Sequence, residues 1–298
     1  MEQLTSQRVA PVEPAATDVE LSLVLPARNE EGAIGAVIEG VRARHPQAEV
    51  IVVNDGSDDD TARVALAAGA QVINRPYGMG NGAAIKTGAR AAHGAVIVFM
   101  DADGQHDPAD IARLLQRIDE GYDMVVGARG VGSQASIGRG VANAMYNRLA
   151  SWMTGHHIAD LTSGFRVVRA ERFREFLHLL PNGFSYPTTS TMAFFRSGYA
   201  VSYVPIVAAR RIGRSHVRPF RDGLRFLLII FKIATLYSPL KLFLPCSAIF
   251  FALGVGRYLY TYAVAQRFTN MSLLLLVASV FVLLIGLVSE QITNLTYK

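Results

Sequence analysis

The sequence predicts an α/β domain with a doubly wound sheet, followed by an apolar helical hairpin. Over residues 21–100, short apolar runs alternate with stretches of helical periodicity, in the order strand, helix, strand, helix, strand, helix, strand. This alternation is typical of a largely parallel sheet with helices on both faces. The residues from 240 onward carry few charges, so they form a separate part of the chain.

Five strands are expected, at residues 21–25, 50–53, 71–73, 96–100 and 124–126. The helix after the first strand has an apolar stripe at helical spacing, made of Ile34, Val37, Ile38 and Val41. Asn29 is expected to cap that helix. A later helix, over about 139–153, has a second stripe, made of Val141, Met145, Leu149 and Trp152.

The fourth strand runs into an acidic turn that contains Asp101 and Asp103. Ligands of open α/β sheets bind at the carboxyl ends of the strands. Two neighbouring carboxylates repel each other unless a cation lies between them. These hard oxygen ligands, with the Gln105 carbonyl nearby, favour Mg²⁺ or Mn²⁺ bound together with substrate phosphates. The alternative is a solvated acidic turn that caps the next helix.

The second strand also runs into an acidic, glycine-containing turn, and Asp55 is expected to contact a bound nucleotide there. The alternative is a turn in which Ser57 or Asp58 caps a helix. The glycines of residues 78–88 do not have the spacing of a dinucleotide-binding loop. They still allow a ligand to approach a helix N-terminus, with Lys86 one turn inside.

Seven motifs in order resemble those of family 2 glycosyltransferases of the GT-A fold, and within them the dolichol-phosphate mannose synthase branch. The resemblance covers about residues 20–240. Two positions depart from the family pattern, because Asn54 stands where many members have Asp and His216 where many have Lys. The motifs are Pro26-Ala-Arg-Asn-Glu30, Asn54-Asp-Gly-Ser57, Gly80-Asn-Gly-Ala-Ala-Ile-Lys-Thr-Gly88, Asp101-Ala-Asp-Gly-Gln105, Gly127-Ala-Arg129, Asp160-Leu-Thr-Ser-Gly-Phe-Arg166 and Arg211-Ile-Gly-Arg-Ser-His216.

The resemblance implies a Rossmann-like GT-A domain that moves a sugar from a nucleotide-diphosphate sugar to a polyprenyl phosphate, with inversion at the anomeric carbon. The implied metal ligands are Asp101, Asp103 and Gln105. The implied donor-binding residues are Pro26, Arg28, Glu30, Asp55, Gly82, Lys86, Asp101, Ala102 and Asp103. The implied acceptor-phosphate ligands are Arg129, Arg139, Asn143, Ser215 and His216. The implied catalytic residues are Asp101, Asp103, Arg129 and Arg211.

Basic residues concentrate between 210 and 225, and a helical pattern of apolar and basic residues continues to 239. A basic amphipathic helix of this kind lies in a membrane interface. Nucleic acid is the rival partner for a basic cluster, but the apolar runs that follow favour a membrane. Residues 240–263 and 268–289 are expected to form a transmembrane hairpin, the first run extending past Arg257. The positive-inside rule places the catalytic side in the cytoplasm.

These patterns divide the chain into an N-terminal arm (1–19) expected to be flexible, a GT-A domain (20–217), a juxtamembrane helix (218–239) and the hairpin (240–298), through which copies of the chain can associate. The one cysteine, Cys246, excludes an internal disulfide, and the N-terminus lacks the pattern of a signal peptide. Two other functions remain open. A processive polysaccharide synthase is disfavoured, because its family carries a Gln-x-x-Arg-Trp motif and no Arg precedes the one tryptophan here, Trp152. A non-catalytic scaffold is disfavoured because the metal carboxylates are intact.

Overall fold

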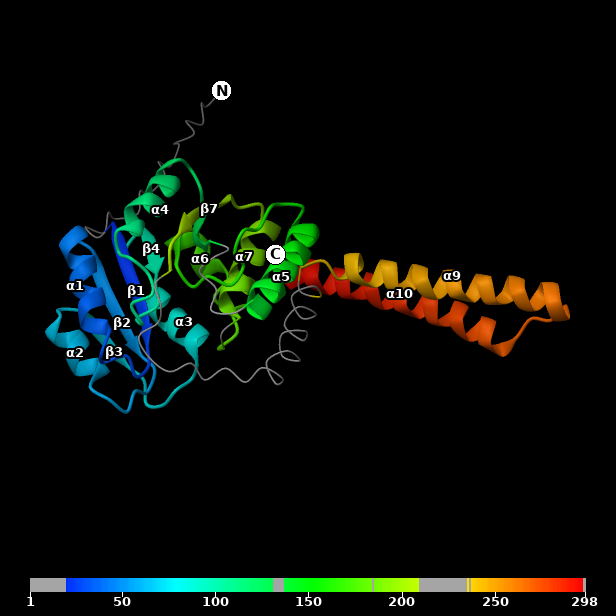
Figure 1. Ribbon diagram of the computed structural model, residues 1–298, viewed down its shortest axis with the longest axis horizontal. Coiled ribbons are helices and arrows are strands. Elements are labelled where there is room, and N and C mark those ends of the chain that lie inside the picture. Colours follow the sequence, from blue (N-terminus) through cyan, green and yellow to red (C-terminus); the bar gives the residue numbers. More distant parts are fainter. Residues whose placement is uncertain (1–19, 131–136, 184, 209–234, 236, 297–298) are drawn as a thin grey trace, which may run out of the picture.

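The computed structural model describes residues 20–130, 137–183, 185–208, 235 and 237–296, and all five expected strands are present (Figure 1). The strands are β1 (Leu21–Ala27), β2 (Glu49–Asn54), β3 (Gln71–Asn74), β4 (Val96–Phe99), β5 (Met124–Arg129), β6 (Arg166–Arg169) and β7 (Val201–Ile206). The helices are α1 (Ile34–Arg44), α2 (Thr61–Ala67), α3 (Asn81–Ala91), α4 (Asp110–Asp119), α5 (Ile137–Thr154), α6 (Ala170–Glu175), α7 (Tyr186–Arg196), α9 (Pro239–Ala265) and α10 (Asn270–Thr296).

The strands form one seven-stranded sheet in the order β3-β2-β1-β4-β6-β5-β7. β6 is antiparallel to both β4 and β5, whereas the other paired strands are parallel. β6 was not predicted from the sequence, because its four residues begin and end with arginine. Since β6 runs in the opposite direction, the segment that precedes it, residues 160–165, lies at the sheet edge where β4 and β5 end.

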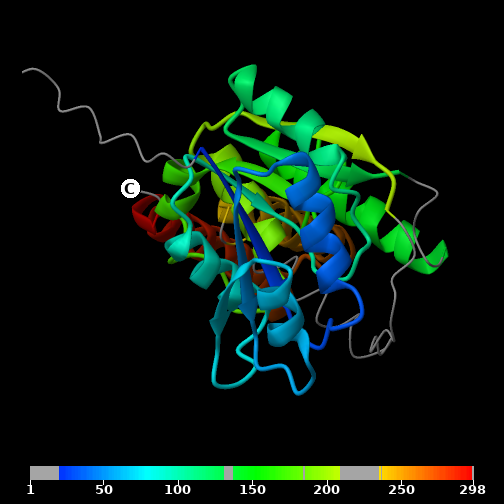
Figure 2. The ribbon, with the colours of Figure 1, turned by 90° about the vertical axis from the view of Figure 1, so that its left-hand side faces the viewer.

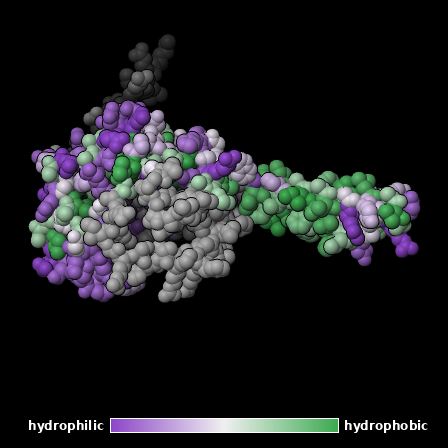
Figure 3. All heavy atoms as spheres, in the orientation of Figure 1, coloured by the Kyte–Doolittle hydropathy of each residue, from purple (hydrophilic) through white to green (hydrophobic). Residues whose placement is uncertain are grey.

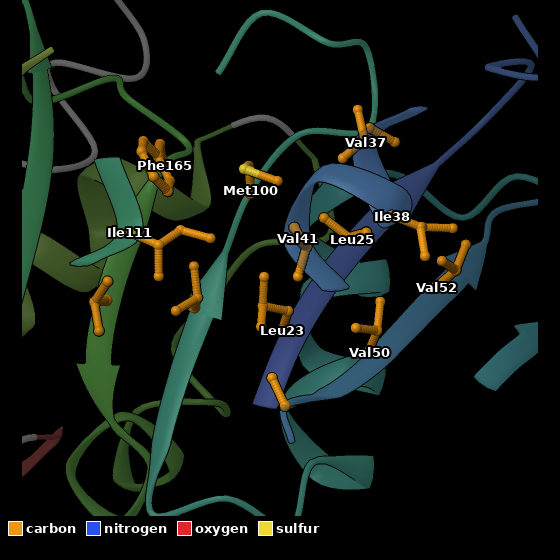
Figure 4. Close-up of a cluster of buried hydrophobic side chains, with 14 of the residues drawn as sticks. Leu23, Leu25, Val37, Ile38, Val41, Val50, Val52, Met100, Ile111 and Phe165 are labelled. Atoms are coloured by element: carbon orange, nitrogen blue, oxygen red, sulfur yellow. The ribbon is translucent and has the colours of Figure 1, made fainter. Parts of the chain in front are cut away.

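Both faces of the sheet are buried, because successive residues of each strand point to opposite sides. Leu23 and Leu25 of β1 pack in one core with the apolar residues of α1, α2 and α4 (Figure 4). Val24, between them, packs in a second core with α3, α6 and α7. Figure 2 shows α1 and α3 on opposite sides of β1. The predicted three-layer α/β arrangement is therefore confirmed.

The prediction that Asn29 caps α1 is wrong. The N-cap residue of α1 is Ala33, which makes no side-chain cap. Asn29 instead has a φ of 55°, its N–H donates to the Ser57 hydroxyl at 3.0 Å, and its side-chain oxygen accepts from the Asp58 N–H at 2.9 Å. Asn29 thus joins the loop after β1 to the loop after β2, and so fixes two neighbouring loops of the functional edge.

Helix α5 is present as predicted, but part of its apolar stripe faces outward. Met145 is 68% exposed and Trp152 is 55% exposed. The neighbouring face contributes Tyr146, Ala150 and Met153 to a third, smaller core with α7, and Leu149 of the stripe packs against that core. The outward apolar residues of α5 can therefore contact a membrane or another molecule.

Helices α9 and α10 form a hairpin that projects from the α/β domain (Figure 1). Each has 27 residues, or about 40 Å of helix, against about 30 Å for the hydrocarbon core of a bilayer. Only 17% of the most apolar window of each helix is buried, so neither is the core helix of a soluble domain. The hairpin surface is mainly hydrophobic, with hydrophilic residues at its far end (Figure 3). α9 continues past Arg257, as a membrane span requires. Most of the expected helix at 218–239, and the arm at 1–19, lie outside the described residues.

Small residues of α9 face α10. Ser247 donates a hydrogen bond to the Ser279 carbonyl at 2.8 Å, and Gly254 lies against Leu276. A Cβ at Gly254 would lie 2.9 Å from the Leu276 side chain, whereas a Cβ at Gly256 meets nothing within 4 Å. Gly254 is therefore required for the close contact of the two helices, and Gly256 is not.

We predict that Gly254→Val destabilises the hairpin, because the added side chain overlaps Leu276. Overpacking of this kind costs about 1–3 kcal/mol. The measurement is the midpoint of heat-induced aggregation of the detergent-solubilised protein. Gly256→Val is the matched control, because it makes the same change on the same helix at a position with open space. Equal midpoints for the two variants would contradict the observed helix packing.

Candidate active site

Asp101 and Asp103 lie directly after β4, at the carboxyl edge of the sheet, as predicted. An oxygen of Asp103, a largely buried residue, accepts a hydrogen bond from the Gln105 N–H at 3.1 Å, which shapes the turn. His106 stacks on Phe165 with 5.0 Å between ring centroids, and its Nε2 lies 3.7 Å from an Asp101 oxygen. The imidazole therefore lies beside the Asp101 carboxylate and restricts its position.

Gly164 allows the backbone before β6 to approach Asp101 closely. A Cβ at Gly164 would lie 2.9 Å from Asp101 Oδ2, which is closer than side chains tolerate. The Tyr186 hydroxyl donates to the Gly164 carbonyl at 3.2 Å and holds this turn in place. Any larger residue at position 164 would displace the carboxylate.

The oxygen ligands at this edge fit a divalent cation. Among the described residues, no group of three His, Cys, Asp or Glu side chains lies close enough to hold a metal ion. A site of two carboxylates, Asp101 and Asp103, with the Gln105 carbonyl suits Mg²⁺ or Mn²⁺, which keep positions for water and substrate phosphates. The ligand set is thus suited to a cation that binds together with a phosphorylated substrate.

Arg129 ends β5 and forms a two-pronged ion pair with Asp160. Its Nε lies 2.8 Å from Asp160 Oδ2 and one terminal nitrogen lies 3.1 Å from Oδ1. The same terminal nitrogen donates to the Thr162 hydroxyl at 2.7 Å. Burial raises the pKa of Asp160, but the hydrogen bonds and charge of Arg129 outweigh it, so the net pKa is lowered. Asp160 is therefore an anion at neutral pH and a weak proton acceptor.

Arg166, at the start of β6, is fully buried and stabilises the backbone at the same edge of the sheet. Its guanidinium donates to the Ser163 and Pro187 carbonyls and to the Ser190 hydroxyl. Burial lowers the pKa of Arg166, and the nearby tyrosine and aspartate groups oppose that effect only in part. Arg166 thus connects the turn before β6 to the first turns of α7.

Asp55 lies after β2 and is 5% exposed. Its carboxylate accepts hydrogen bonds from the Met79 and Gly80 N–H groups, both at 2.9 Å, and lies 3.0 Å from a nitrogen of Arg75. These contacts fix the loop between β3 and α3. The expected contact of Asp55 with a nucleotide stays a prediction.

The N-terminus of α3 is covered by another loop. The Gly82 and Ala83 N–H groups donate to the Gly183 and Asn182 carbonyls at 3.2 and 3.1 Å. Lys86 donates to the Leu180 carbonyl at 3.0 Å and to the Asn182 side chain at 2.6 Å. The expectation that this helix N-terminus is open to a ligand is therefore wrong. Contact of Gly82 or Lys86 with a donor stays a prediction.

The remaining predicted donor residues gather at the ends of β1 and β4. Pro26 lies in β1, the Arg28 guanidinium lies against Gly78, and the Glu30 N–H donates to the Thr61 hydroxyl at 2.9 Å. Ala102 is buried between the two carboxylates of the acidic turn. The tertiary structure thus brings these residues to the same edge as Asp55 and Asp101.

Part of the predicted acceptor site lies outside the described residues. Arg139 and Asn143 are on the first half of α5, but their side chains are not described. Arg211, Ser215 and His216 fall in 209–234, which is not described either. Their roles stay predictions.

Comparison with known families assigns the α/β domain. Residues 22–177, or 156 of the 298 residues, match glycosyl transferase family 2. The chain belongs to glycosyl transferase family 2. Residues 238–295 match the GtrB C-terminal hairpin, which coincides with α9 and α10. The predicted family, the glycosyltransferase activity and the predicted fold class are confirmed.

Relatives within family 2 share most of the chain. It is 33% identical over 208 residues to a dolichyl-phosphate hexose transferase of Haloferax volcanii, covering 68% of this chain and 89% of the relative. It is 30% identical over 205 residues to the polyprenol monophosphomannose synthase of Mycolicibacterium smegmatis, covering 63% and 77%. The solved glucosyl-3-phosphoglycerate synthase of Mycobacterium tuberculosis, with Mn²⁺, uridine-diphosphate-glucose and phosphoglyceric acid, has a TM-score of 0.57 and 25% identity, covering 73% of this chain and 78% of that chain.

Sequence reasoning missed several residues of this glycosyltransferase site. Gly164 is inside a quoted motif and His106 directly follows another, but nothing in the sequence places them beside Asp101. The Asp160–Arg129 pair joins residues 31 positions apart, so only the fold reveals it. The available signal was the Asp160–Arg166 motif itself, which combines an acid, a glycine and a basic residue before a strand that was not recognised.

We predict that Asp160→Asn lowers the thermal stability of the family 2 domain at pH 7, because it leaves the half-buried Arg129 without its carboxylate. Breaking one partner of a buried pair costs about 3 kcal/mol. The folded-state pKa of Asp160 is lowered, so its stabilisation is present above the unfolded value of about 3.9 and is lost as the pH falls through the folded pKa.

The midpoint of thermal unfolding, measured from pH 7 to pH 3.5, tests this expectation. The difference between wild type and Asp160→Asn should be largest at pH 7 and should shrink at the acid end. Asp60→Asn is the matched control, because it removes a carboxylate from the exposed ion pair with Arg63. Surface pairs contribute little, so this control should stay close to wild type. A constant difference at every pH would contradict the assignment.

Proposed function

We propose that this glycosyltransferase moves a sugar from a nucleotide-diphosphate sugar to a polyprenyl phosphate at a membrane surface. The observation that carries the proposal is the attachment of the apolar hairpin to the α/β domain. Lys241, in the first turn of α9, donates to the Met153 carbonyl at the end of α5 at 2.8 Å. Tyr237 and Leu242 pack in the small core of α5 and α7. A lipid acceptor explains why the catalytic domain is joined so closely to such a hairpin.

The names of the relatives support a polyprenyl acceptor. One transfers hexose to dolichyl phosphate, and another makes polyprenol monophosphomannose. A third, from Klebsiella pneumoniae, is an undecaprenyl-phosphate 4-deoxy-4-formamido-L-arabinose transferase, 36% identical over 162 residues that cover 50% of this chain and 49% of the relative. These acceptors share a phosphate and a long apolar tail, which matches a site beside a membrane anchor.

The donor side consists of Asp101, Asp103 and Gln105, with Asp55 and Arg28 at the neighbouring strand ends. A bound Mg²⁺ or Mn²⁺ would neutralise the charge on the departing nucleoside diphosphate. Asp101 and Asp103 would hold that cation, and His106 and Gly164 would keep Asp101 in position. Asp55 would fix the loop on which the nucleotide rests.

The acceptor side would consist of Arg129, Arg139 and Asn143, completed by Arg211, Ser215 and His216. Guanidinium groups match the geometry of phosphate oxygens. By analogy with phosphorylated side chains, the second pKa of the acceptor phosphate is about 6, so the nucleophile is already anionic at neutral pH. The lowered pKa of Asp160 agrees with a reaction that needs no strong base. In-line attack on the anomeric carbon inverts its configuration.

The outward face of α5 supports contact with the bilayer. Met145 and Trp152 are exposed on the helix that is attached to the hairpin by Lys241. Tryptophan is enriched at membrane–water interfaces. Membrane lipid is therefore a proposed partner of α5, and association of copies through the hairpin stays a prediction.

The proposal is tested by incubating membranes that contain the protein with labelled nucleotide sugars and a polyprenyl phosphate. The donor panel includes GDP-mannose, UDP-glucose and UDP-N-acetylglucosamine. The expected product is a labelled lipid that dissolves in organic solvent and is stable to alkali or labile to acid. Its formation identifies the nucleotide sugar as donor and the polyprenyl phosphate as acceptor. Transfer to water-soluble acceptors alone, with none to lipid phosphate, would refute the proposed acceptor class.

We predict that Asp103→Asn abolishes sugar transfer while the protein stays folded, because the variant loses a charged ligand of the proposed cation. Asp101→Asn and EDTA treatment of the wild type should act likewise. Asp107→Asn is the matched control, since it removes an exposed carboxylate from the same loop. The rate of transfer and the unfolding midpoint are measured together. Near-normal transfer by Asp103→Asn in Mg²⁺ or Mn²⁺ would rule out the proposed cation site.

We predict that Arg139→Gln raises the acceptor concentration needed for half-maximal transfer and leaves nucleotide binding nearly unchanged. A lost charge-assisted hydrogen bond is worth about 1.5–3 kcal/mol, or about 10- to 150-fold. Arg148→Gln, at an exposed position of the same helix, is the control. Calorimetry with nucleoside diphosphate measures the donor side separately. Weakened nucleotide binding with an unchanged acceptor requirement would reverse the proposed division of the site.

We predict that the α/β domain and the C-terminus face the cytoplasm. Reporter fusions after Arg267, in the loop between α9 and α10, and after Lys298 should report opposite sides of the membrane. The physical reason is the concentration of basic residues before the first span. Reporters on the same side would mean that the hairpin does not cross.

A further inference from the structure

A cavity of about 510 Å³ lies where the hairpin joins the α/β domain. Its walls come from the end of α7, the start of α9 and the end of α10. The polar and aromatic residues that line it include Arg196, Ser197, Tyr237, Ser238, Lys241 and Asn294. Pockets of about 300–1,000 Å³ hold small-molecule ligands, so this cavity is large enough for a polar headgroup.

The cavity lies at the depth where the apolar helices begin. Ser238 is the N-cap of α9, and Asn294 is in the last turn of α10. Beyond it, Leu244 is 51% exposed and Val288 is 59% exposed, so apolar surface continues along the hairpin away from the domain. In a membrane, this is the level of the lipid headgroups, with acyl chains alongside the helices.

The two cations of the cavity have several neutral partners. Lys241 donates to the Met153 carbonyl at 2.8 Å, and an ammonium group has three donors. Arg196 donates to the Asn294 side-chain oxygen at 2.6 Å and lies over the Tyr237 ring, 5.8 Å from its centroid. These contacts fix the positions of both side chains.

One carboxylate reduces this positive charge only in part. Glu290 lies 3.7 Å from a nitrogen of Arg196, and it accepts a hydrogen bond from the Leu240 N–H at 3.1 Å. Among the described residues that line the cavity or contact its lining, Arg196 and Lys241 outnumber this one anion, so their summed charge is positive. A guanidinium fork beside an ammonium group and two serine hydroxyls matches a phosphate ester.

The cavity is separate from the predicted acceptor site. Arg139 is on the first half of α5, whereas Lys241 contacts Met153 near its end. These positions are 14 residues apart, or about 21 Å along the helix. A phosphate in the cavity would therefore lie far from one held by Arg139.

We propose that the cavity binds the phosphate of an anionic phospholipid from the leaflet next to the catalytic domain. Arg196 and Lys241 contact the phosphate, Ser197 and Ser238 contact the glycerol headgroup, and the acyl chains lie along the exposed apolar face of the hairpin. The bound lipid stabilises the junction between the hairpin and the helices α5 and α7. This inference needs the hairpin to be in a membrane, but it does not depend on the identity of the sugar donor or acceptor.

Native mass spectrometry of the full chain in neutral detergent tests the proposal. Phosphatidylglycerol and phosphatidylcholine are titrated in parallel against wild type and Arg196→Gln/Lys241→Gln. We expect one phosphatidylglycerol bound at least about 10-fold more tightly than phosphatidylcholine, and loss of this preference in the double variant. Arg267→Gln/Arg257→Gln, which removes two cations near the far end of the hairpin, should keep it. Equal binding of both lipids by wild type would overturn the proposal.

Further measurements separate the possible sources of the phosphate. Displacement of phosphatidylglycerol by millimolar glycerol 3-phosphate or inorganic phosphate would show a site for soluble phosphates and overturn the lipid assignment. The unfolding midpoint of wild type should rise with phosphatidylglycerol and not with phosphatidylcholine, whereas the double variant should respond equally to both. Arg196→Lys keeps the charge and should retain the preference. If the double variant instead lost binding of polyprenyl phosphate, the cavity would belong to the acceptor site and the proposal would fail.

Discussion

The antiparallel pairing of β6 with β4 and β5 is the constraint on which the active site depends. A parallel strand at this position would deliver residues 160–165 to the opposite edge of the sheet. The reversed direction places Gly164 against Asp101 and Asp160 against Arg129. Phe165 then stacks on His106. One reversed strand thus assembles the acidic turn, the arginine at the end of β5 and the residues that hold them in place.

At this edge of the sheet, the acidic turn and Arg129 lie at the ends of different strands, and we propose a different task for each. In that proposal the acidic turn after β4 would hold a cation, whereas Arg129 would hold an anion. The pair of Arg129 with Asp160 keeps the guanidinium oriented and leaves it part-exposed to solvent. The fully buried Arg166 has a different task, because its hydrogen bonds are to carbonyl and hydroxyl groups that fix the surrounding backbone.

The junction gives the family 2 domain a defined position relative to the apolar hairpin. Lys241 binds the end of α5, Arg196 binds Asn294 of α10, and Tyr237 packs in the small core of α5 and α7. These contacts involve the two helices, α5 and α7, that also border the active site. The same helices therefore connect the apolar hairpin to the active-site edge of the sheet. A bound phospholipid at the junction would reinforce this connection.

The sequence by itself determined the α/β class, the five strands before residue 130, the acidic turn and the two apolar helices, because each follows from local periodicity or composition. It also carried the family 2 motifs. Only the tertiary structure decided which motif residues meet. The positions of Gly164, His106 and Asp160 depend on the unpredicted β6, and the outward face of α5 depends on which side of that helix packs on α7. The covered N-terminus of α3 depends on a loop about 100 residues away in the chain. Contacts of this kind leave no pattern in the local sequence. Periodicity shows which residues share one face of a helix or strand, but it does not show which other element packs on that face.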